Sequence, residues 1–310
     1  MSIAIYTGSE KLSLRWQETL HKVLPEKKIE VYPNISDFKA IQFLICWGPY
    51  SGLIDKFYNL KAIQSLGAGV DHIFKLNVID PKIKVIKIVH HQLRQDMWEH
   101  ALGVVLADMK NFHLYYEYEA QKYWKRRRYR SIKDTSIGIL GLGRIGGFVA
   151  QQFTQLGFEV KGWSRSKKEI ENVSTFVGQD GLDQVCEESD YLINILPLTQ
   201  STIGILDERF FRKMKSSGYL VNLGRGPQLI DNDLLKCLDS DQIRGAYLDV
   251  FQVEPLPDHH AFWYHPKVIV TPHIASITDI DSVYPQVVEN IRRLELGQEL
   301  LNTIDVERGY

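Results

Sequence analysis

Cysteine is scarce in this sequence of 310 residues, and neither sign of charge dominates. The three cysteines, Cys46, Cys186 and Cys237, are widely spaced and match neither a metal-binding nor a redox motif. Lys and Arg number 37 against 38 Asp and Glu, so no general attraction to polyanions or membranes is expected. We see no transmembrane-length apolar run and no signal peptide. These absences predict a cytoplasmic protein with no metal, nucleic-acid or membrane partner.

Short apolar runs alternate with helical patterns along most of the chain, which predicts an α/β fold built on parallel sheets. The expected strands are 3–7, 29–32, 43–47, 63–66, 85–88, 191–196, 219–223, 245–250 and 268–271. The expected helices are 12–24, 53–57, 96–110, 208–214, 232–238 and 281–296. The chain length suggests about two domains. We predict two doubly wound parallel-sheet domains with a cleft between them.

The helix at 96–110 is expected to link the two domains. A nucleotide domain would then span 98–280, and a substrate domain would combine 1–97 with 281–310. The stretch 112–130 that follows the helix is aromatic and basic, and includes Lys125 to Arg128. Such a stretch could suggest nucleic acid. Because the rest of the chain is not basic, a solvated face or a subunit arm is the favoured interpretation.

The most informative local motif is formed by Gly141, Gly143 and Gly146. An apolar run from Ser136 to Leu140 predicts a buried strand that leads directly into this Gly-x-Gly-x-x-Gly sequence. A helical pattern and a second apolar stretch, Phe158 to Trp163, complete a β-α-β unit. In such a unit the glycines make a tight turn, admit a pyrophosphate and let helix pack on strand. The motif predicts a Rossmann domain that binds a dinucleotide.

The second strand of this unit lacks the acidic residue with which NAD-preferring sites usually bind the ribose 2′-OH. After Trp163 the sequence reads Ser164, Arg165 and Ser166, and no acid occurs before Glu169. Hydroxyls and a guanidinium would bind a 2′-phosphate through charge-assisted hydrogen bonds, whereas a carboxylate would repel it. Arg165 could also lie over the adenine. The sequence therefore favours NADP(H) over NAD(H); the alternative is a polar turn with accidental cations.

Three polar side chains follow three of the later predicted strands. Arg225 stands between two glycines after 219–223, Glu254 follows 245–250 and His273 follows 268–271. Because ligands bind outside the carboxyl ends of strands in open α/β sheets, these residues are expected to converge on a bound nicotinamide. An arginine can polarise a 2-keto acid, a histidine can protonate its carbonyl oxygen and a carboxylate can stabilise the imidazolium. Each residue alone could be structural; together they predict reduction of a 2-keto acid.

Several motifs in a fixed order resemble those of the D-isomer-specific 2-hydroxyacid dehydrogenases. Within that family, the Trp-Ser-Arg-Ser stretch at 163–166 and Arg-Gly-Tyr at 308–310 are similar to the glyoxylate/hydroxypyruvate reductase A subgroup. The family motifs are Ser-Leu-Gly-Ala-Gly-Val-Asp-His at 65–72, Gly-Leu-Gly-Arg-Ile-Gly at 141–146, Asn-Leu-Gly-Arg-Gly at 222–226, Leu-Asp-Val-Phe at 248–251 with Glu-Pro at 254–255, and Thr-Pro-His at 271–273.

The resemblance implies roles for the residues at matching positions. Arg225 would bind the substrate carboxylate and carbonyl, His273 would be the acid/base and Glu254 would support it. Backbone N–H groups around Ala68, Gly69 and Val70 would hold the substrate carboxylate. The cofactor contacts would come from Arg144 and Ile145 at the pyrophosphate, from Leu196, Pro197 and Thr202 beside the adenosine half, from Leu223, and from Asp249 at the nicotinamide carboxamide.

The sequence constrains the choice of substrate less than it constrains the type of reaction. Trp47 and Trp98 are candidate pocket walls as well as candidate core residues. Bulky walls favour glyoxylate or hydroxypyruvate, reduced to glycolate or D-glycerate, although other short 2-keto acids stay open. By resemblance we also expect a homodimer built on the helix from about 98 and the arm to about 130. A dehydrogenase for another 2-keto acid and a nucleotide-sensing binding protein of the same fold are the alternatives.

Overall fold

The computed structural model describes residues 1–74, 78–89 and 91–304, and divides into two compact units. One unit combines Met1–Gln92 with Thr278–Tyr310, and the other is Leu93–Ile277. The boundaries predicted from the sequence lie a few residues further along, after 97 and after 280. The motif Arg308-Gly309-Tyr310 lies outside the described residues.

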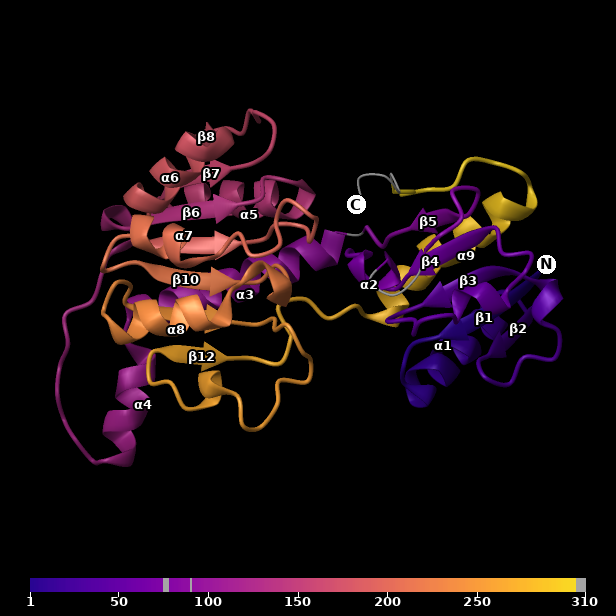
Figure 1. The fold of residues 1–310 in the computed structure, drawn as a ribbon, viewed down its shortest axis with the longest axis horizontal. Helices are drawn as coiled ribbons and strands as arrows, with labels where there is room; N and C mark the ends of the chain where they lie inside the picture. The colour runs from indigo at the N-terminus through magenta and orange to yellow at the C-terminus, as the bar shows by residue number, and fades with distance from the viewer. Residues whose placement is uncertain (75–77, 90, 305–310) are drawn as a thin grey trace. The chain divides into compact units, whose positions relative to one another are not determined.

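The first unit is built on a parallel sheet of five strands in the order β2-β1-β3-β4-β5 (Figure 1). Its strands are β1 (Ser2–Tyr6), β2 (Lys28–Val31), β3 (Ile41–Cys46), β4 (Ala62–Ser65) and β5 (Lys84–Ile86), and its helices are α1 (Glu10–Val23), α2 (Asp71–Phe74) and α9 (Ile280–Glu295). Successive residues of β1 point to opposite faces of the sheet. Ile3 packs with α1 and α9, whereas Ala4 packs with the segments around Leu53 and Ile73.

The second unit is built on seven parallel strands in the order β12-β11-β10-β9-β6-β7-β8 (Figure 1). The strands are β6 (Ser136–Leu140), β7 (Glu159–Trp163), β8 (Val173–Phe176), β9 (Tyr191–Asn194), β10 (Tyr219–Asn222), β11 (Gly245–Leu248) and β12 (Val268–Val270). The helices are α3 (His91–Met109), α4 (Phe112–Ala120), α5 (Arg144–Gln155), α6 (Gly178–Glu188), α7 (Glu208–Lys213) and α8 (Asp231–Asp239).

Two apolar layers cover the two faces of this sheet. Helices α3 and α5 pack on the face that carries Ile137 and Ile139, and α6, α7 and α8 pack on the face that carries Leu140 and Leu192. The prediction of two doubly wound parallel-sheet domains is therefore confirmed. Because every strand is parallel, all carboxyl ends within one sheet lie along the same edge.

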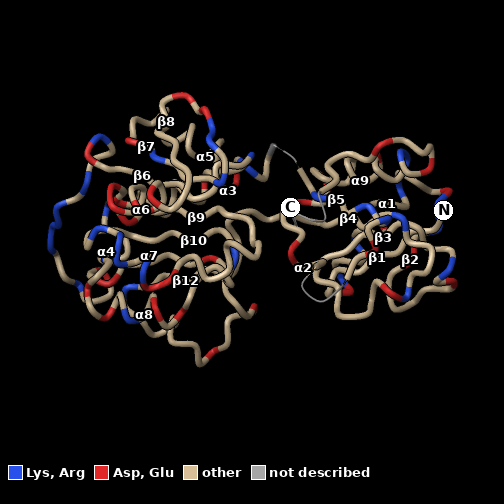
Figure 2. Tube along the Cα trace, turned by 45° about the horizontal axis from the view of Figure 1, so that its top comes forward, with Lys and Arg blue, Asp and Glu red and all other residues tan. Residues whose placement is uncertain are grey.

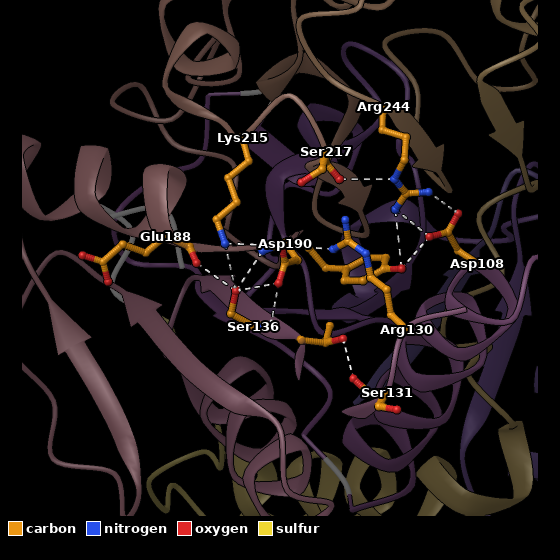
Figure 3. Close-up of polar contacts among 11 residues, drawn as sticks. Asp108, Arg130, Ser131, Ser136, Glu188, Asp190, Lys215, Ser217 and Arg244 are labelled. Carbon is orange, nitrogen blue, oxygen red and sulfur yellow. Dashed lines mark hydrogen bonds and ion pairs between the residues drawn. The ribbon is translucent and has the colours of Figure 1, made fainter. Parts of the chain in front are cut away.

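The aromatic and basic segment leaves the second unit after α3. It forms α4 and then continues without regular structure to Ser131. Several Lys and Arg residues follow one another along this irregular part (Figure 2). Polar clusters at the amino ends of the strands hold both ends of this segment (Figure 3). Arg244 donates two hydrogen bonds of 2.8 and 2.7 Å to the buried carboxylate of Asp108, and Arg130 pairs with Asp190 at 3.0 Å.

The local predictions failed in several places, among them 53–57, α6 and β8. The helix expected at 53–57 is a single 3-10 turn, Ile54–Lys56, because its apolar spacing reflects burial of Leu53, Ile54 and Phe57 in a segment too short for a stable α-helix. Helix α6 was missed because Gly178 and Gly181 lower its helix propensity, although its buried face packs well. Strand β8 was missed too, since it is a short edge strand with no fully buried residue.

Candidate active site

The glycine loop lies where the strand order of the second unit reverses. It follows β6, which pairs with β9 on one side and β7 on the other, so it sits at the topological switch point of the sheet. Gly141 has φ +103°, a conformation that side chains disfavour, and a Cβ at Gly146 would stand 1.9 Å from the carbonyl oxygen of Gly141. Both positions therefore require glycine.

The start of α5 fits a pyrophosphate. Gly143 precedes the first helical residue and carries no side chain that could cap the first N–H groups of the helix. A Cβ at Gly143 would meet no protein atom within 4 Å, so the loop is open on that side. Helix N-termini with open N–H groups bind phosphates. The backbone of Gly143, Arg144 and Ile145 accordingly suits the role that the sequence predicted.

The turn after β7 lies beside this loop. The N–H group of Gly141 donates to the carbonyl of Trp163 at 2.8 Å, and Ser164 Oγ donates to the carbonyl of Ser166 at 2.8 Å. Ser164 is thus committed to the turn and is buried, whereas Arg165 and Ser166 are exposed. The turn that carries Arg165 and Ser166 therefore adjoins the dinucleotide loop, and residues 164–166 include no carboxylate.

The loop after β9 is held together by its own hydroxyls. Thr202 Oγ1 donates to the carbonyl of Pro197 at 2.8 Å and accepts from the N–H of Thr199 at 2.8 Å. The side chains of Leu196 and Leu223 are buried in the two apolar layers. For Leu196, Pro197, Thr202 and Leu223 the cofactor-binding role stays a prediction.

Three buried amides that sequence reasoning missed connect this loop to Arg225. Gln228 Nε2 donates to the carbonyls of Leu196 and Pro197 at 3.1 and 3.0 Å, and Gln228 Oε1 accepts from the backbone N–H of Arg225 at 2.8 Å. Asn194 Nδ2 donates to Gln228 Oε1 and to Asn222 Oδ1 at 2.7 and 2.9 Å. All three amide residues have exposed fractions of 0%. The signal was available: Asn194 and Asn222 are polar residues at the ends of two apolar strands.

Arg225 begins the tight turn after β10. Its Nη1 donates to the carbonyl of Gly224 at 2.8 Å. A Cβ at Gly226 would stand 1.8 Å from the carbonyl carbon of Phe251, so the Arg225 turn packs directly on the segment that leads to Glu254. Glycine at 226 is what allows these two loops to touch.

His273 and Glu254 form a hydrogen-bonded pair. The distance between His273 Nδ1 and Glu254 Oε2 is 2.7 Å, and Glu254 Oε1 accepts from the N–H of Phe251 at 2.9 Å. His273 has φ +54°, in the left-handed region that few residues other than glycine occupy. Strained backbone of this kind is concentrated at functional sites. Here it places the imidazole ring against the carboxylate.

The pair determines which nitrogen of His273 is available. A carboxylate can only accept hydrogen bonds, so Nδ1 carries a hydrogen that it donates to Glu254. Nε2 is then the nitrogen left to exchange a proton with a ligand. Burial raises the pKa of Glu254, but the hydrogen bonds from His273 and Phe251 and the charges of His273 and Arg225 outweigh burial and lower that pKa below its usual range. The charge of Arg225 therefore acts on the same carboxylate that binds His273.

Replacement of Glu254 by glutamine tests the lowered pKa of this carboxyl group through the pH dependence of thermal stability. Because the pKa of Glu254 is lower when folded, its stabilising contribution is complete above the unfolded pKa and is lost as pH falls through the folded pKa. We expect Glu254→Gln to lower the Tm by a constant amount above about pH 5, and by progressively less in more acidic solution. Thermal melts of both proteins from neutral to acid pH measure this. A Tm difference that grows toward acid pH would contradict the assignment.

Asp249 is fully buried and shapes the His273 loop. Its carboxylate accepts hydrogen bonds from Thr271 Oγ1 at 2.6 Å and from the N–H groups of Ile274 and Ala275, both at 2.9 Å. These three bonds span both sides of His273 and so hold it in its left-handed conformation. A contact between Asp249 and the nicotinamide carboxamide stays a prediction.

The first unit carries the predicted substrate-carboxylate loop after β4. Ser65 Oγ accepts from the N–H of Gly67 at 3.2 Å and donates to the carbonyl of Gly69 at 2.9 Å, which curls the loop around one buried hydroxyl. Within the part of the chain that the structure describes, the N–H groups of Ala68, Gly69 and Val70 have no hydrogen-bond acceptor. A loop with several open N–H groups suits an anion.

The two candidate tryptophans differ in environment. Trp47 is half-buried, with its ring 4.2 Å from the His72 ring. Trp98 is 7% exposed and packs edge-on against Phe153 at 4.8 Å, which supports its alternative interpretation as a core residue. Among residues 1–74, 78–89 and 91–304, no helix is long and apolar enough to cross a membrane, and no group of His, Cys, Asp or Glu is arranged to hold a metal ion.

The chain belongs to the D-isomer specific 2-hydroxyacid dehydrogenase family. Residues 102–275, more than half of the chain, match the family described as D-isomer specific 2-hydroxyacid dehydrogenase, NAD binding domain. The matched range covers the glycine loop and all three members of the Arg225, Glu254 and His273 set. The protein is accordingly a nicotinamide-dependent dehydrogenase of 2-hydroxy acids, as the resemblance of the sequence implied.

The names of individual relatives are more specific about the substrate than the family description is. The chain is 36% identical over 301 residues to glyoxylate/hydroxypyruvate reductase A of Photorhabdus laumondii, covering 96% of each chain. Among solved structures, an NADPH-dependent glyoxylate/hydroxypyruvate reductase from Sinorhizobium meliloti, in complex with NADP and sulfate, is 31% identical with a TM-score of 0.92 and full coverage of both chains. A family member from Xanthobacter autotrophicus, in complex with NADPH and MES, is 31% identical with a TM-score of 0.91 and covers 100% of this chain and 99% of that chain.

Proposed function

We propose that this enzyme uses NADPH to reduce small 2-keto acids, glyoxylate to glycolate and hydroxypyruvate to D-glycerate. The observation that carries the proposal is the 2.7 Å pair of His273 and Glu254, which lies under the influence of the Arg225 charge in a chain of this family. The names of the Photorhabdus and Sinorhizobium relatives support the choice of substrates.

Each member of the set has a chemical task in the proposed reaction. Arg225 binds the carboxylate and the carbonyl oxygen of the substrate and withdraws electron density from the carbonyl carbon. His273 donates the proton on Nε2 to that oxygen, while Glu254 fixes the ring through Nδ1 and stabilises its charged form. NADPH, when bound, supplies the hydride that reduces the carbonyl carbon. Ala68, Gly69 and Val70 offer N–H groups for the substrate carboxylate.

The preference for NADPH rests on the turn after β7. Arg165 is exposed beside the dinucleotide loop, and the turn lacks the carboxylate that would repel a 2′-phosphate. We expect Arg165→Ala to raise the Kd for NADPH by about tenfold to a hundredfold and to change that for NADH little, because a charge-assisted hydrogen bond is lost from the phosphorylated nucleotide alone. Fluorescence titration with both nucleotides measures this discrimination.

Arg15→Ala is the matched control, since it removes one exposed arginine from α1 in the other unit. It should leave both dissociation constants unchanged. Equal weakening of NADPH and NADH by Arg165→Ala would remove Arg165 from the 2′-phosphate site.

The substrate assignment is tested with a panel of short 2-keto acids. We expect kcat/KM to be higher for glyoxylate and hydroxypyruvate than for bulkier acids, with NADPH preferred over NADH. A pocket discriminates weakly between substrates that differ by one methylene, so the bulkier members of the panel are the informative ones. Preference for a larger 2-keto acid would redirect the assignment within the same reaction.

A cytoplasmic location and a homodimer belong to the same proposal. The three cysteines are buried and unpaired, as is usual in a reducing compartment. The segment from α4 to Arg130 exposes Phe112, Tyr116 and Trp124, with Trp124 at 92%, and this apolar surface suits a second copy of the chain. Light scattering after gel filtration tests the dimer, and a monomer at micromolar concentration would exclude it.

A further inference from the structure

The Arg225 turn is fastened to the segment after β9 by both the backbone and the side chain of Gln228. At one end of that segment, Gln228 Nε2 donates to the carbonyls of Leu196 and Pro197 at 3.1 and 3.0 Å. At the other end, the N–H of Leu206 donates to the carbonyl of Gln228 at 2.9 Å. A single residue of the Arg225 turn therefore holds both ends of the segment.

The backbone partners of the Gln228 amide fix which of its atoms is the donor and which the acceptor. Backbone carbonyls only accept hydrogen bonds, so the group that faces Leu196 and Pro197 is the NH₂ group. The N–H of Arg225 only donates, so the atom 2.8 Å from it is Oε1. Asn194 Nδ2 donates to the same oxygen at 2.7 Å. The amide thus uses both of its donor hydrogens and both acceptor positions of its oxygen.

The space around this amide is closely packed. Gln228 and Asn194 both have exposed fractions of 0%. A Cβ at Gly224 would stand 2.4 Å from Gln228 Oε1 and 2.6 Å from Asn194 Nδ2. Polar groups are costly to bury in such a place unless their hydrogen bonds are made, and an apolar side chain of similar volume would also fill it. Packing alone therefore does not require an amide at 228.

We propose that Gln228 is a positioning residue for Arg225: its side chain locks the backbone of that arginine to the segment after β9 and so fixes where the guanidinium meets a 2-keto acid. Arg225 Nη1 donates to the carbonyl of Gly224 at 2.8 Å, so the guanidinium is itself held to the turn that Gln228 anchors. The inference rests on the proposed function, because that function makes Arg225 the group that binds the substrate.

The first test measures the anchor directly and requires no turnover. Gln228→Met keeps the approximate volume of the side chain and removes its hydrogen bonds. We expect the N–H of Arg225 to exchange with solvent about threefold to tenfold faster in this variant, the effect of one lost hydrogen bond. Two-dimensional NMR of the full-length protein in deuterium oxide gives the rate. An unchanged exchange rate would overturn the proposal.

The second test asks whether Gln228 acts through Arg225. At saturating NADPH, Gln228→Met should lower kcat/KM for glyoxylate about tenfold, because the guanidinium is no longer held in place. Once Arg225→Ala has removed the guanidinium, the same change at 228 should alter kcat/KM by less than about twofold. Losses that multiply in the double variant would show that Gln228 acts independently of Arg225. Full activity of Gln228→Met would refute the positioning role.

A carboxyl group at 228 gives a pH signature that a general loss of stability does not. In Gln228→Glu, the protonated group both donates and accepts, as the amide does, whereas the ionised group only accepts and faces the carbonyls of Leu196 and Pro197 unfavourably. The deficit in kcat/KM relative to wild type should therefore grow as the pH rises and the carboxyl group ionises. A deficit that is constant between about pH 5 and pH 9 would contradict the proposal.

Asn290→Leu is the matched control, since Asn290 is a fully buried amide of the other unit that binds the backbone of Leu301. It should lower the Tm and leave the kinetics with glyoxylate at those of wild type. Equal kinetic losses in Asn290→Leu and Gln228→Met would mark a general effect of removing a buried amide and overturn the inference. If the wild-type protein reduces no 2-keto acid, the proposed function fails, whereas the exchange rate of the Arg225 N–H still decides whether Gln228 anchors this turn.

Discussion

Replacing His273 with alanine is expected to lower kcat for glyoxylate by about 10²- to 10⁴-fold, the usual contribution of a positioned general acid. The expectation follows from the hydrogen-bond arrangement at 2.7 Å. Nδ1 is committed to Glu254, so Nε2 is the proton donor and no other nitrogen of that ring can replace it. Stopped-flow and steady-state measurements of NADPH oxidation give kcat and show whether the reductive step itself is slowed.

The binding of NADPH should survive the substitution of His273, since the glycine loop and the turn at 164–166 do not depend on the imidazole. His21→Ala, on the exposed face of α1, serves as the control and should behave as wild type. Retention of wild-type kcat in His273→Ala would refute the acid/base role. Loss of NADPH binding together with activity would show instead that the histidine maintains the loop structure.

Replacing Arg225 should be nearly as damaging, and for a different reason. Arg225→Ala is expected to lower kcat/KM for glyoxylate by about 10³-fold, with a higher KM and a lower kcat, because the guanidinium both binds the substrate and stabilises charge on its carbonyl oxygen. Arg225→Lys keeps the charge but loses the planar fork and should recover only part of the activity. Steady-state kinetics over a range of glyoxylate concentrations separate the two parameters.

Arg212→Ala is the control for loss of an arginine, since this exposed residue forms its ion pair with Glu208 on the same helix, α7. Normal kinetics in Arg225→Ala would remove this arginine from the substrate site. A rise in KM with unchanged kcat would reduce its role to substrate binding.

The parts of the site that follow a short-range rule could be predicted from the sequence. Gly141 and Gly146 mark a turn and a helix–strand contact that no other residue permits, and the structure shows both. Arg225, Glu254 and His273 each follow an apolar strand, and parallel strands bring their carboxyl ends to one edge. The hydrogen bond between His273 and Glu254 joins residues whose separation in the sequence is modest.

The parts that depend on tertiary contacts could not be predicted. Gln228 looks like an ordinary polar residue in a turn, and its burial among Asn194 and Asn222 emerges only when β9 and β10 are adjacent. The link from His100 to Tyr247 joins α3 to β11 across 147 residues. At 53–57 the apolar residues have helical spacing because their side chains are individually buried, although the segment is not an α-helix. Periodicity alone does not distinguish such a buried segment from a helix.

Oxidation of NADPH by the purified protein, with glyoxylate and hydroxypyruvate as substrates and His273→Ala measured in parallel, tests the central claim most directly. We expect both keto acids to be reduced by the wild-type enzyme, and the variant to bind NADPH but turn over at least about 100-fold more slowly. Absence of NADPH oxidation with any short 2-keto acid, in a protein that still binds the nucleotide, would contradict the enzymatic account and favour a nucleotide-sensing role.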